Sequence, residues 1–470
     1  MISLTLADMA SITRGRLFHP TGEVIPEMVV SGLVDTDSRE IGPGDIFVAK
    51  PGEFTDGWNF IADAYAAGAV VVVAERESSI AIPHIIVDDV VIALADLARE
   101  VVARVRAGGE LTVIGITGSN GKTTTKNLVA DLCSRLGPTV WPKASFNNEV
   151  GAPLTMLRVR HDTRYLVLEL GASGVGHIAL LTDIVALDIG VVLMVGLAHA
   201  GEFGGMESTI IAKTELVQGI RAAGTAVLNA DDPNVARMAE NAPGDVVWFG
   251  RGSAATVRAS DVDTALDGTT FNLHFSDGET LPVRFPVLGE HHVMNALAMA
   301  AVAEVLGAPH ALVSDVLATT SRAERWRMEV MGGKGVVVIN DAYNASPDSM
   351  AAALRTLARV GEPSQRRVAV LGEMSELGEF SGDEHDAIAL LVVRLNIDVL
   401  VVVGAGARRL FISSINEGSW AGESVFFESA DEAYDYLMTI LRDDDIVLVK
   451  SSNSAGLRFL GDKLGEAFAC

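Results

Sequence analysis

One stretch of the sequence constrains the fold more than any other. Leu111–Thr117, LTVIGIT, is a continuous apolar run, which is typical of a strand buried on both faces. A glycine-rich turn follows, and then an apolar stripe at helical spacing that ends before Gly137-Pro138. This order of strand, glycine turn and helix predicts a parallel α/β sheet with an anion held at the start of the helix.

The turn itself, GSNGKTTTK, has the chemistry of a loop that holds nucleotide phosphate. Gly118 and Gly121 let the backbone wrap a phosphate, Lys122 reaches the outer phosphates, and the Thr123 hydroxyl ligates Mg²⁺. Its spacing is G-x-x-G-x-x-G-K-T, starting at Gly115, and differs from the strict G-x-x-x-x-G-K-[ST] pattern. The alternative is a chance glycine turn, but strand, lysine and helix together favour a nucleotide. The other expected contacts are Ser119, Asn120 and Thr124.

Composition excludes several classes of function. The formal charge is 36 − 61 = −25, so broad binding to nucleic acid or to an anionic membrane is not expected. The two cysteines offer no disulfide framework. The N-terminus lacks a secretory signal pattern, and the most apolar window, Ala179–Ala198, contains Asp183 and Asp188. We therefore expect a soluble cytoplasmic protein with a buried strand in that window.

Strand-like and helix-like segments alternate along the chain, which predicts α/β domains with mostly parallel sheets. We expect a small α/β N-terminal domain (1–107), a central P-loop domain with a parallel sheet (108–320) and a C-terminal Rossmann-like domain (321–470). The segment FNLHFSDGETLPVRF alternates around a Ser-Asp-Gly turn, so we expect an antiparallel hairpin within the central domain.

Two side chains follow strands that should neighbour the loop. Glu169 ends the run YLVLEL, and His199 comes just after GVVLMVG. The carboxyl ends of parallel strands meet at one edge of a sheet, so both side chains should face the nucleotide and could bind metal. Taken singly, Glu169 could equally be a solvated residue, and a lone histidine is more often structural. Together with the loop they favour an enzyme that uses Mg²⁺ and ATP.

These residues resemble the Mur ligase superfamily of ATP-dependent amide-forming enzymes. Thr117–Thr123 match the family loop T-G-[TS]-[NK]-G-K-[TS], including its glycine spacing. FNNEVG, LELGAS, LAHAGEFGGMESTIIAKTEL and GEHHVMNALA continue the resemblance. Near the C-terminus, NDAYNASPDSM and LGEMSELG resemble the branch that adds D-alanyl-D-alanine. The branch that adds the third residue typically has a D-Y-A-H-x-P block and an Asp-Asn-Pro-Arg motif, and neither is present.

The resemblance implies a role for each matching residue. His199 would bind a second Mg²⁺ beside Thr123 and Glu169, and Lys213 would be carbamylated, although without the family match it reads as an exposed helix lysine. Nucleotide contacts would come from Asn295, Arg327 at a phosphate and Asp341 at the ribose. Substrate contacts would come from Asp37, Ser38, Arg39, Asn147, Asn148, Tyr343 and Asn344. The sequence departs from the family pattern at Trp58, His292, Ser346, Ser451 and Asn453.

The resemblance also implies a reaction. ATP would phosphorylate the terminal carboxylate of UDP-N-acetylmuramoyl-tripeptide, and the amine of D-alanyl-D-alanine would attack the acyl phosphate. The enzyme would be a cytoplasmic monomer with no nucleic-acid or membrane partner, in peptidoglycan precursor synthesis. Alternatives are another Mur ligase, such as the enzyme that adds the third residue, or a P-loop ATPase without ligase activity. The sequence leaves open whether the third residue is lysine or diaminopimelate.

Overall fold

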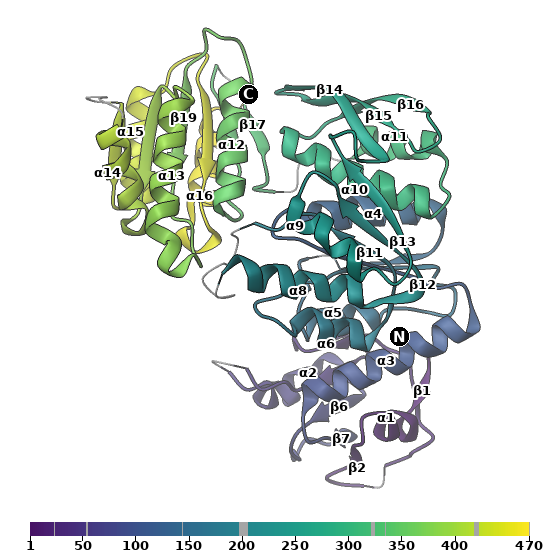
Figure 1. Cartoon of the computed structure of the whole chain (residues 1–470). Coiled ribbons are helices and arrows are strands. Elements are labelled where there is room, and N and C mark those ends of the chain that lie inside the picture. The colour runs from purple at the N-terminus through teal and green to yellow at the C-terminus, as the bar shows by residue number, and fades with distance from the viewer. Residues whose placement is uncertain are drawn as a thin grey trace.

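The chain folds into three α/β bodies, each built around its own sheet (Figure 1). The computed structural model describes residues 1–22, 24–52, 55–142, 144–196, 205–320, 325–333, 335–417 and 423–469. In Figure 1 the N-terminal body lies at the bottom, the central body at the right and the C-terminal body at the upper left. The predicted α/β class with three sheet domains is confirmed.

The N-terminal body holds a five-stranded sheet in the order β2-β7-β6-β5-β4 and a separate β1-β3 pair. Its strands are β1 (Leu4–Thr5), β2 (Arg16–Phe18), β3 (Val29–Val30), β4 (Val34–Asp35), β5 (Ile46–Val48), β6 (Val71–Ala74) and β7 (His84–Ile86). Its helices are α1 (Leu6–Ile12), the 3₁₀ turn η1 (Gly57–Phe60), α2 (Ile61–Ala67) and α3 (Val90–Gly108).

Helix α3 joins the first two bodies. Asp89 caps its start by accepting from the backbone N–H groups of Val91 and Ile92. Its buried face, which includes Leu97 and Val101, belongs to a hydrophobic core shared with strands of both bodies. The helix also packs on α5 (Gly151–Met156) and α6 (His177–Ile184) of the central body. The domain boundary expected near residue 108 stays a prediction, because this helix serves both cores.

The central body is a nine-stranded sheet in the order β16-β15-β14-β13-β12-β11-β8-β10-β9. Its strands are β8 (Thr112–Thr117), β9 (Thr139–Val140), β10 (Tyr165–Glu169), β11 (Leu187–Val192), β12 (Ile220–Asn229), β13 (Asp245–Gly250), β14 (Val257–Ala265), β15 (Gly268–His274) and β16 (Thr280–Phe285). Its other helices are α4 (Lys122–Leu136), α8 (Met206–Gln218), α9 (Pro233–Ala236), η2 (Arg237–Asn241), α10 (Glu290–Val305) and α11 (His310–Thr319).

Strand β8 lies between β10 and β11 in this sheet and is parallel to both. The strand therefore delivers the glycine turn to the same sheet edge as Glu169, which ends β10. Strand β15 pairs antiparallel with both β14 and β16. The β15–β16 pair is the predicted hairpin, which is therefore confirmed. The window from Ala179 contains the end of α6 and the buried strand β11, and no helix in the described ranges is long and apolar enough to cross a bilayer.

The C-terminal body is a six-stranded sheet in the order β17-β18-β22-β19-β20-β21, in which only the pairing of β17 with β18 is antiparallel. Hydrophobic cores lie on both faces, as expected for a doubly wound sheet. Its strands are β17 (Glu329–Gly332), β18 (Val337–Asn340), β19 (Arg367–Leu371), β20 (Val399–Val403), β21 (Ser424–Phe427) and β22 (Ile446–Lys450). Its helices are α12 (Pro347–Arg359), η3 (Gly378–Phe380), α13 (Ser381–Arg394), η4 (Ala405–Ala407), α14 (Arg408–Glu417), α15 (Ala430–Ile440), η5 (Asn453–Ala455) and α16 (Leu457–Ala467).

A buried carboxylate on β11 ties α3 to the central sheet, and this contact is testable. Asp188 accepts from the Val113 backbone N–H at 2.7 Å and from the Arg106 guanidinium at 2.8 Å. Replacing Asp188 with Asn leaves the Arg106 charge without its partner, so the free energy of unfolding should fall by about 3 kcal/mol. Asp131→Asn, in an exposed ion pair with Arg135, is the matched control and should cost about 0.5 kcal/mol or less. Equal losses in urea unfolding would contradict this assignment.

Candidate active site

The glycine turn presents open backbone N–H groups at the start of α4. Gly121 occupies the N-cap with a φ of +85°, and no side chain caps the helix. A Cβ there would lie 2.4 Å from the side-chain oxygen of Asn295, so only glycine fits both the conformation and the space. Lys122 folds back over the turn and donates to the Gly118 carbonyl at 2.6 Å. An uncapped helix start beside a lysine is suited to bind phosphate.

A cavity of about 250 Å³ opens at this turn, between the central and C-terminal bodies. Thirteen of the predicted site residues line it: Ser119, Asn120, Gly121, Lys122, Thr123, Thr124, Asn147, Glu169, Asn295, Arg327, Asp341, Tyr343 and Asn344. Gly118 forms the turn below them. His199 lies outside the described residues. The ligand contacts of all these residues stay predictions.

Glu169 lies at the floor of the cavity with one carboxylate oxygen unsatisfied. Its Oε1 accepts from the Asn147 amide at 2.9 Å, whereas Oε2 is buried and finds no hydrogen-bond partner in the described part of the chain. The side chain is only 2% exposed. A buried carboxylate oxygen left unpaired is costly, and a cation would satisfy it. The donor set of Glu169 and the Thr123 hydroxyl therefore fits Mg²⁺.

Lys213 on α8 is buried, so the reading as an exposed helix lysine is wrong. Its side chain reaches a neighbouring cavity of about 560 Å³, which Lys122, Asn147 and Asn148 also line. Burial, and then repulsion by Lys122, lowers the pKa of Lys213 to about 7. Much of this amine is therefore uncharged and nucleophilic at neutral pH. Asn148 has a second task, because its side-chain oxygen accepts from the Gly151 N–H at the start of α5.

The C-terminal body supplies a buried ion pair that the predicted site did not include. Lys450 ends β22 and is 2% exposed, and its ammonium lies 2.6 Å from the Asp341 carboxylate. It also donates to the Asn344 carbonyl at 3.1 Å. The signal in the sequence is the position of Lys450 at the end of a strand in the block VLVKSSNS, because β22 pairs with β18, which leads into Asp341. Lys450 thus holds Asp341 and Asn344, two of the residues predicted to contact ligands, in position.

Arg327 crosses from the C-terminal body to the nucleotide turn. Its guanidinium lies 4.1 Å from the centre of the Tyr343 ring and 3.4 Å from the Thr123 hydroxyl. The residues on either side, Trp326 and Met328, both have positive φ. Such strained backbone persists only where surrounding contacts enforce it, and it is common at binding sites.

Two neighbouring histidines line the cavity as neutral groups. Burial lowers the pKa of His291 to about 4 and that of His292 well below its usual value. The Asn295 amide lies 3.2 Å from His292 Nδ1. His291 also borders a further cavity of about 260 Å³, together with Met294 and Thr356. Uncharged rings in this position suit contact with a nucleobase better than with a phosphate.

The departures from the family pattern have local partners. The Trp58 indole donates to the Glu77 carbonyl. Ser346 caps α12 and donates to the Asn120 side chain at 3.2 Å, which links two bodies. Ser451 is buried and donates to the Ser452 carbonyl, and Asn453 accepts from Arg458.

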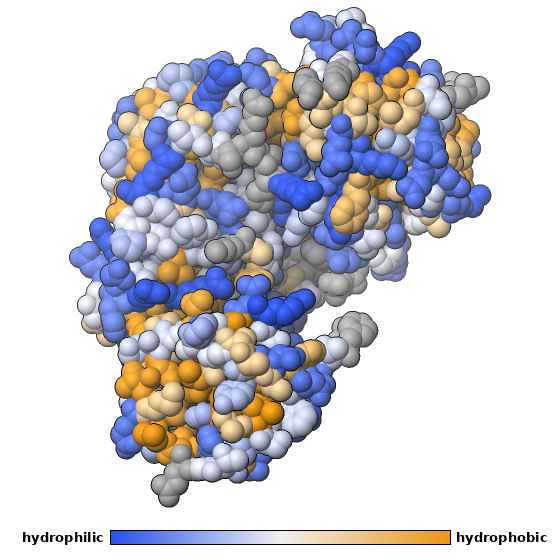
Figure 2. All heavy atoms as spheres, turned by 180° about the vertical axis from the view of Figure 1, so that it is seen from behind, coloured by the Kyte–Doolittle hydropathy of each residue, from blue (hydrophilic) through white to orange (hydrophobic). Residues whose placement is uncertain are grey.

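A separate cavity of about 750 Å³ lies on the N-terminal body. The predicted residues Asp37, Ser38 and Arg39 line it together with Lys50. Hydrogen bonds from Arg39 lower the pKa of Asp37 to about 2, so this carboxylate stays ionised. The view from behind shows a hollow between the C-terminal body, at the upper right, and the rest of the molecule (Figure 2).

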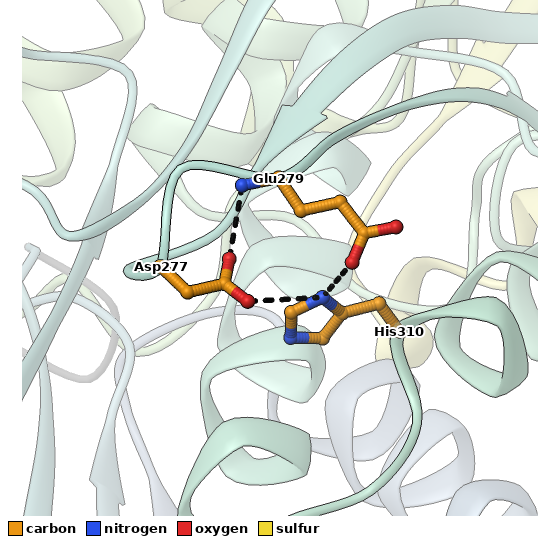
Figure 3. A group of neighbouring side chains, drawn as sticks. All are labelled: Asp277, Glu279 and His310. Atoms are coloured by element: carbon orange, nitrogen blue, oxygen red, sulfur yellow. Dashed lines mark hydrogen bonds and ion pairs between the residues drawn. The ribbon is translucent and has the colours of Figure 1, made fainter.

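One other group of metal-type side chains lies far along the central sheet, at the β15–β16 turn. His310 Nδ1 is 2.6 Å from a Glu279 oxygen and 4.0 Å from an Asp277 oxygen (Figure 3). The His310 ring also stacks on Phe275. Asp277, Glu279 and His310 form the one such cluster among the described residues. The histidine already pairs with the two carboxylates, so we interpret the cluster as a contact that holds the β15–β16 hairpin against α11.

A nucleotide turn facing a second α/β body defines a class of enzymes that act on a nucleotide between domains. Family models match residues 32–107 ("Mur ligase family, catalytic domain"), 116–303 ("Mur ligase middle domain") and 326–453 ("Mur ligase, glutamate ligase domain"). The chain belongs to the Mur ligase family.

Relatives match it over its whole length. The UDP-N-acetylmuramoyl-tripeptide–D-alanyl-D-alanine ligase of Mycobacterium tuberculosis is 43% identical over 100% of this chain and 99% of its own, and that of Escherichia coli is 30% identical over 100% of both. Crystal structure I of MurF from Acinetobacter baumannii superposes with a TM-score of 0.88 at 30% identity, covering 99% of each chain. MurF ligase from Thermotoga maritima in complex with ADP gives 0.81 at 27% identity, over 93% of this chain and 97% of that one.

The Lys450–Asp341 pair should matter for nucleotide binding. Lys450→Met removes the ammonium that pairs with the nearly buried Asp341 carboxylate. The carboxylate should then move from its present position, and ATP affinity should fall by about tenfold. Lys463→Met is the matched control, because Lys463 is half-exposed and pairs with an exposed Asp431. Calorimetric titration with a non-hydrolysable ATP analogue measures both variants. Unchanged affinity in a folded Lys450→Met protein would contradict the role.

Proposed function

We propose that this chain joins D-alanyl-D-alanine to UDP-N-acetylmuramoyl-tripeptide, with ATP converted to ADP and phosphate, in peptidoglycan precursor synthesis. The similarity to relatives with this activity, at up to 43% identity over the full length, carries the proposal. The two adjoining cavities agree with this proposal. The glycine turn at Lys122 and the Glu169 carboxylate line the first, and the buried Lys213 lines the second.

ATP would lie along the first cavity. Its phosphates would occupy the turn at Lys122 and the open start of α4, with Arg327 beside them. The ribose would meet Asp341, which Lys450 holds in place. The base would pass Asn295 and the neutral histidines toward the 260 Å³ cavity.

Mg²⁺ would be held by Thr123 and Glu169, with His199 as the proposed ligand of a second ion. Bound there, it would neutralise phosphate charge and polarise the γ-phosphoryl group. Lys213 would react as a free amine with CO₂, forming an N–C bond and releasing a proton. The product carbamate is an anion, which offers an oxygen ligand in place of a buried cation.

The reaction would proceed in two displacements. The terminal carboxylate of the tripeptide attacks the γ-phosphorus, and ADP leaves with the electron pair of the broken P–O bond. The amine of the dipeptide then attacks the acyl carbon, the C–N bond forms, phosphate leaves with the electron pair of the broken C–O bond, and the nitrogen loses one proton and keeps one as the amide N–H. A carboxylate has a poor leaving group, and phosphorylation supplies a good one. Lys122 would stabilise the charge that develops on the transferred group.

The remaining parts of the cleft would hold the acceptors. Asp37, Ser38 and Arg39 would contact the UDP end, and Asn147 and Asn148 the peptide end, of the nucleotide substrate. Tyr343 and Asn344 would contact the dipeptide. A cytoplasmic monomer without nucleic-acid or membrane partners also remains part of the proposal.

Phosphate release tests the proposed function directly. Purified protein with ATP and Mg²⁺ receives each acceptor alone and then both, while the UDP product is followed by mass. Release that requires both acceptors and yields the pentapeptide is expected. Release without any acceptor would indicate an ATPase, and dependence on a different amino acid would indicate another branch of the family.

Activity should depend on CO₂ and on pH through Lys213. A pKa of about 7 leaves roughly half of the amine neutral at pH 7, against about one lysine in 3,000 at an ordinary pKa. Protonation blocks carbamylation, so the rate should fall as the pH drops through about 7, and bicarbonate should restore rate lost in CO₂-depleted buffer. Lys213→Arg cannot form the carbamate and should lower turnover about 100-fold, whereas Lys463→Arg should not. A rate indifferent to bicarbonate would exclude carbamylation.

A further inference from the structure

The motif LGEMSELG places one carboxylate in the cleft that no role above uses. Glu376 follows β19 and is exposed, whereas Met374 and Leu377 on either side are each 1% exposed and packed in the core. Glu376 has a φ of +65°, which L-residues other than glycine rarely adopt. Two buried anchors thus force a strained residue outward, toward solvent and the cavity.

The loop that carries Glu376 is held by hydrogen bonds from two sides. His385 Nδ1 lies 2.6 Å from the Ser381 carbonyl, so it carries the proton and leaves Nε2 to accept from the Met374 N–H at 3.2 Å. On the other side, the Ser375 N–H donates to the Ser452 hydroxyl at 2.7 Å. The position of the Glu376 backbone is therefore fixed before any substrate binds.

Glu376 borders the 560 Å³ cavity from the C-terminal side. Every other described residue that lines this cavity comes from the central body, between Lys122 and Lys213. The remaining titratable groups on its wall are Glu149 and His177. The cavity thus has Lys122 on the side where the phosphorylated carboxylate would lie, and a single acid from the C-terminal body.

We propose that Glu376 binds the ammonium group of the incoming dipeptide; this rests on the proposed function. The amine would have to reach an acyl carbon held beside Lys122, whose ammonium repels another ammonium group. A carboxylate on the opposite wall forms a charge-assisted hydrogen bond to that ammonium and orients its nitrogen. The ammonium must first lose a proton to solvent, because only the free amine has the lone pair that attacks, so Glu376 acts on binding more than on the chemical step.

Kinetics of Glu376→Gln test this role. The variant keeps the size of the side chain and removes its charge, so KM for D-alanyl-D-alanine should rise about 10- to 100-fold, the usual effect of losing a hydrogen bond to a charged group. The KM values for ATP and for the UDP-tripeptide should change less than threefold. Glu379→Gln is the matched control, because this exposed acid lies three residues further on and does not line the cavity.

A ligand that lacks the amino group separates ammonium recognition from general damage. N-propanoyl-D-alanine is the dipeptide without its amino group, and its inhibition constant should be the same for wild type and Glu376→Gln. Equal weakening of the dipeptide and of this analogue would overturn the proposal. A rise in KM for the UDP-tripeptide alone would also overturn it, and would assign Glu376 to the side-chain amine of the third residue.

The two proposals fail in different ways. A wild-type protein that forms no pentapeptide would overturn the proposed function before any variant is compared. A wild-type protein that forms pentapeptide, with an unchanged dipeptide KM in Glu376→Gln, would overturn the Glu376 assignment alone. Glu376→Gly removes the carboxylate while accommodating the positive φ, so it should fold at least as well as wild type and show the same selective rise in KM.

Discussion

Buried positive charge in a strongly acidic protein is the constraint on which the cleft depends. The chain carries a formal charge of −25, yet burial lowers the pKa of both Lys122 and Lys213. Repulsion by Arg327 lowers the pKa of Lys122 further, and repulsion by Lys122 lowers that of Lys213. Cations held this way are unstable without anions, and the Glu169 carboxylate raises the pKa of Lys122. The cavities are therefore prepared for phosphates and carboxylates, while the rest of the surface repels polyanions.

The central body alone does not complete this arrangement. Arg327, Asp341 and Lys450 come from the C-terminal body, and the first reaches the Thr123 hydroxyl. Ser346 reaches Asn120, and Arg359 pairs with Glu290 on α10. These described contacts between the bodies are polar, which suits surfaces that part for substrates to enter and meet again for chemistry.

The sequence predicted local features well and burial poorly. The strand–turn–helix at Leu111–Leu136, the hairpin and the doubly wound C-terminal sheet follow from short-range patterns, and the structure has them. The helical pattern around Lys213 alone predicts an exposed side chain. The side chain is buried because α8 packs on strands that are distant in sequence. Lys450 and Glu376 are similar cases: each is an ordinary charged residue until β22 or β19 is placed against the cleft. Family resemblance supplied Lys213 where periodicity could not.

Backbone strain gathers on the C-terminal face of the cleft. Trp326, Met328 and Glu376 all have positive φ although none is glycine. Each borders a functional position: the first two flank Arg327, and the third is itself exposed to the cavity. Such backbone strain persists only where the surrounding structure enforces it, so the course of the chain at these positions is fixed. The proposed contacts of Arg327 with phosphate and of Glu376 with an ammonium group therefore start from backbone that is already in place.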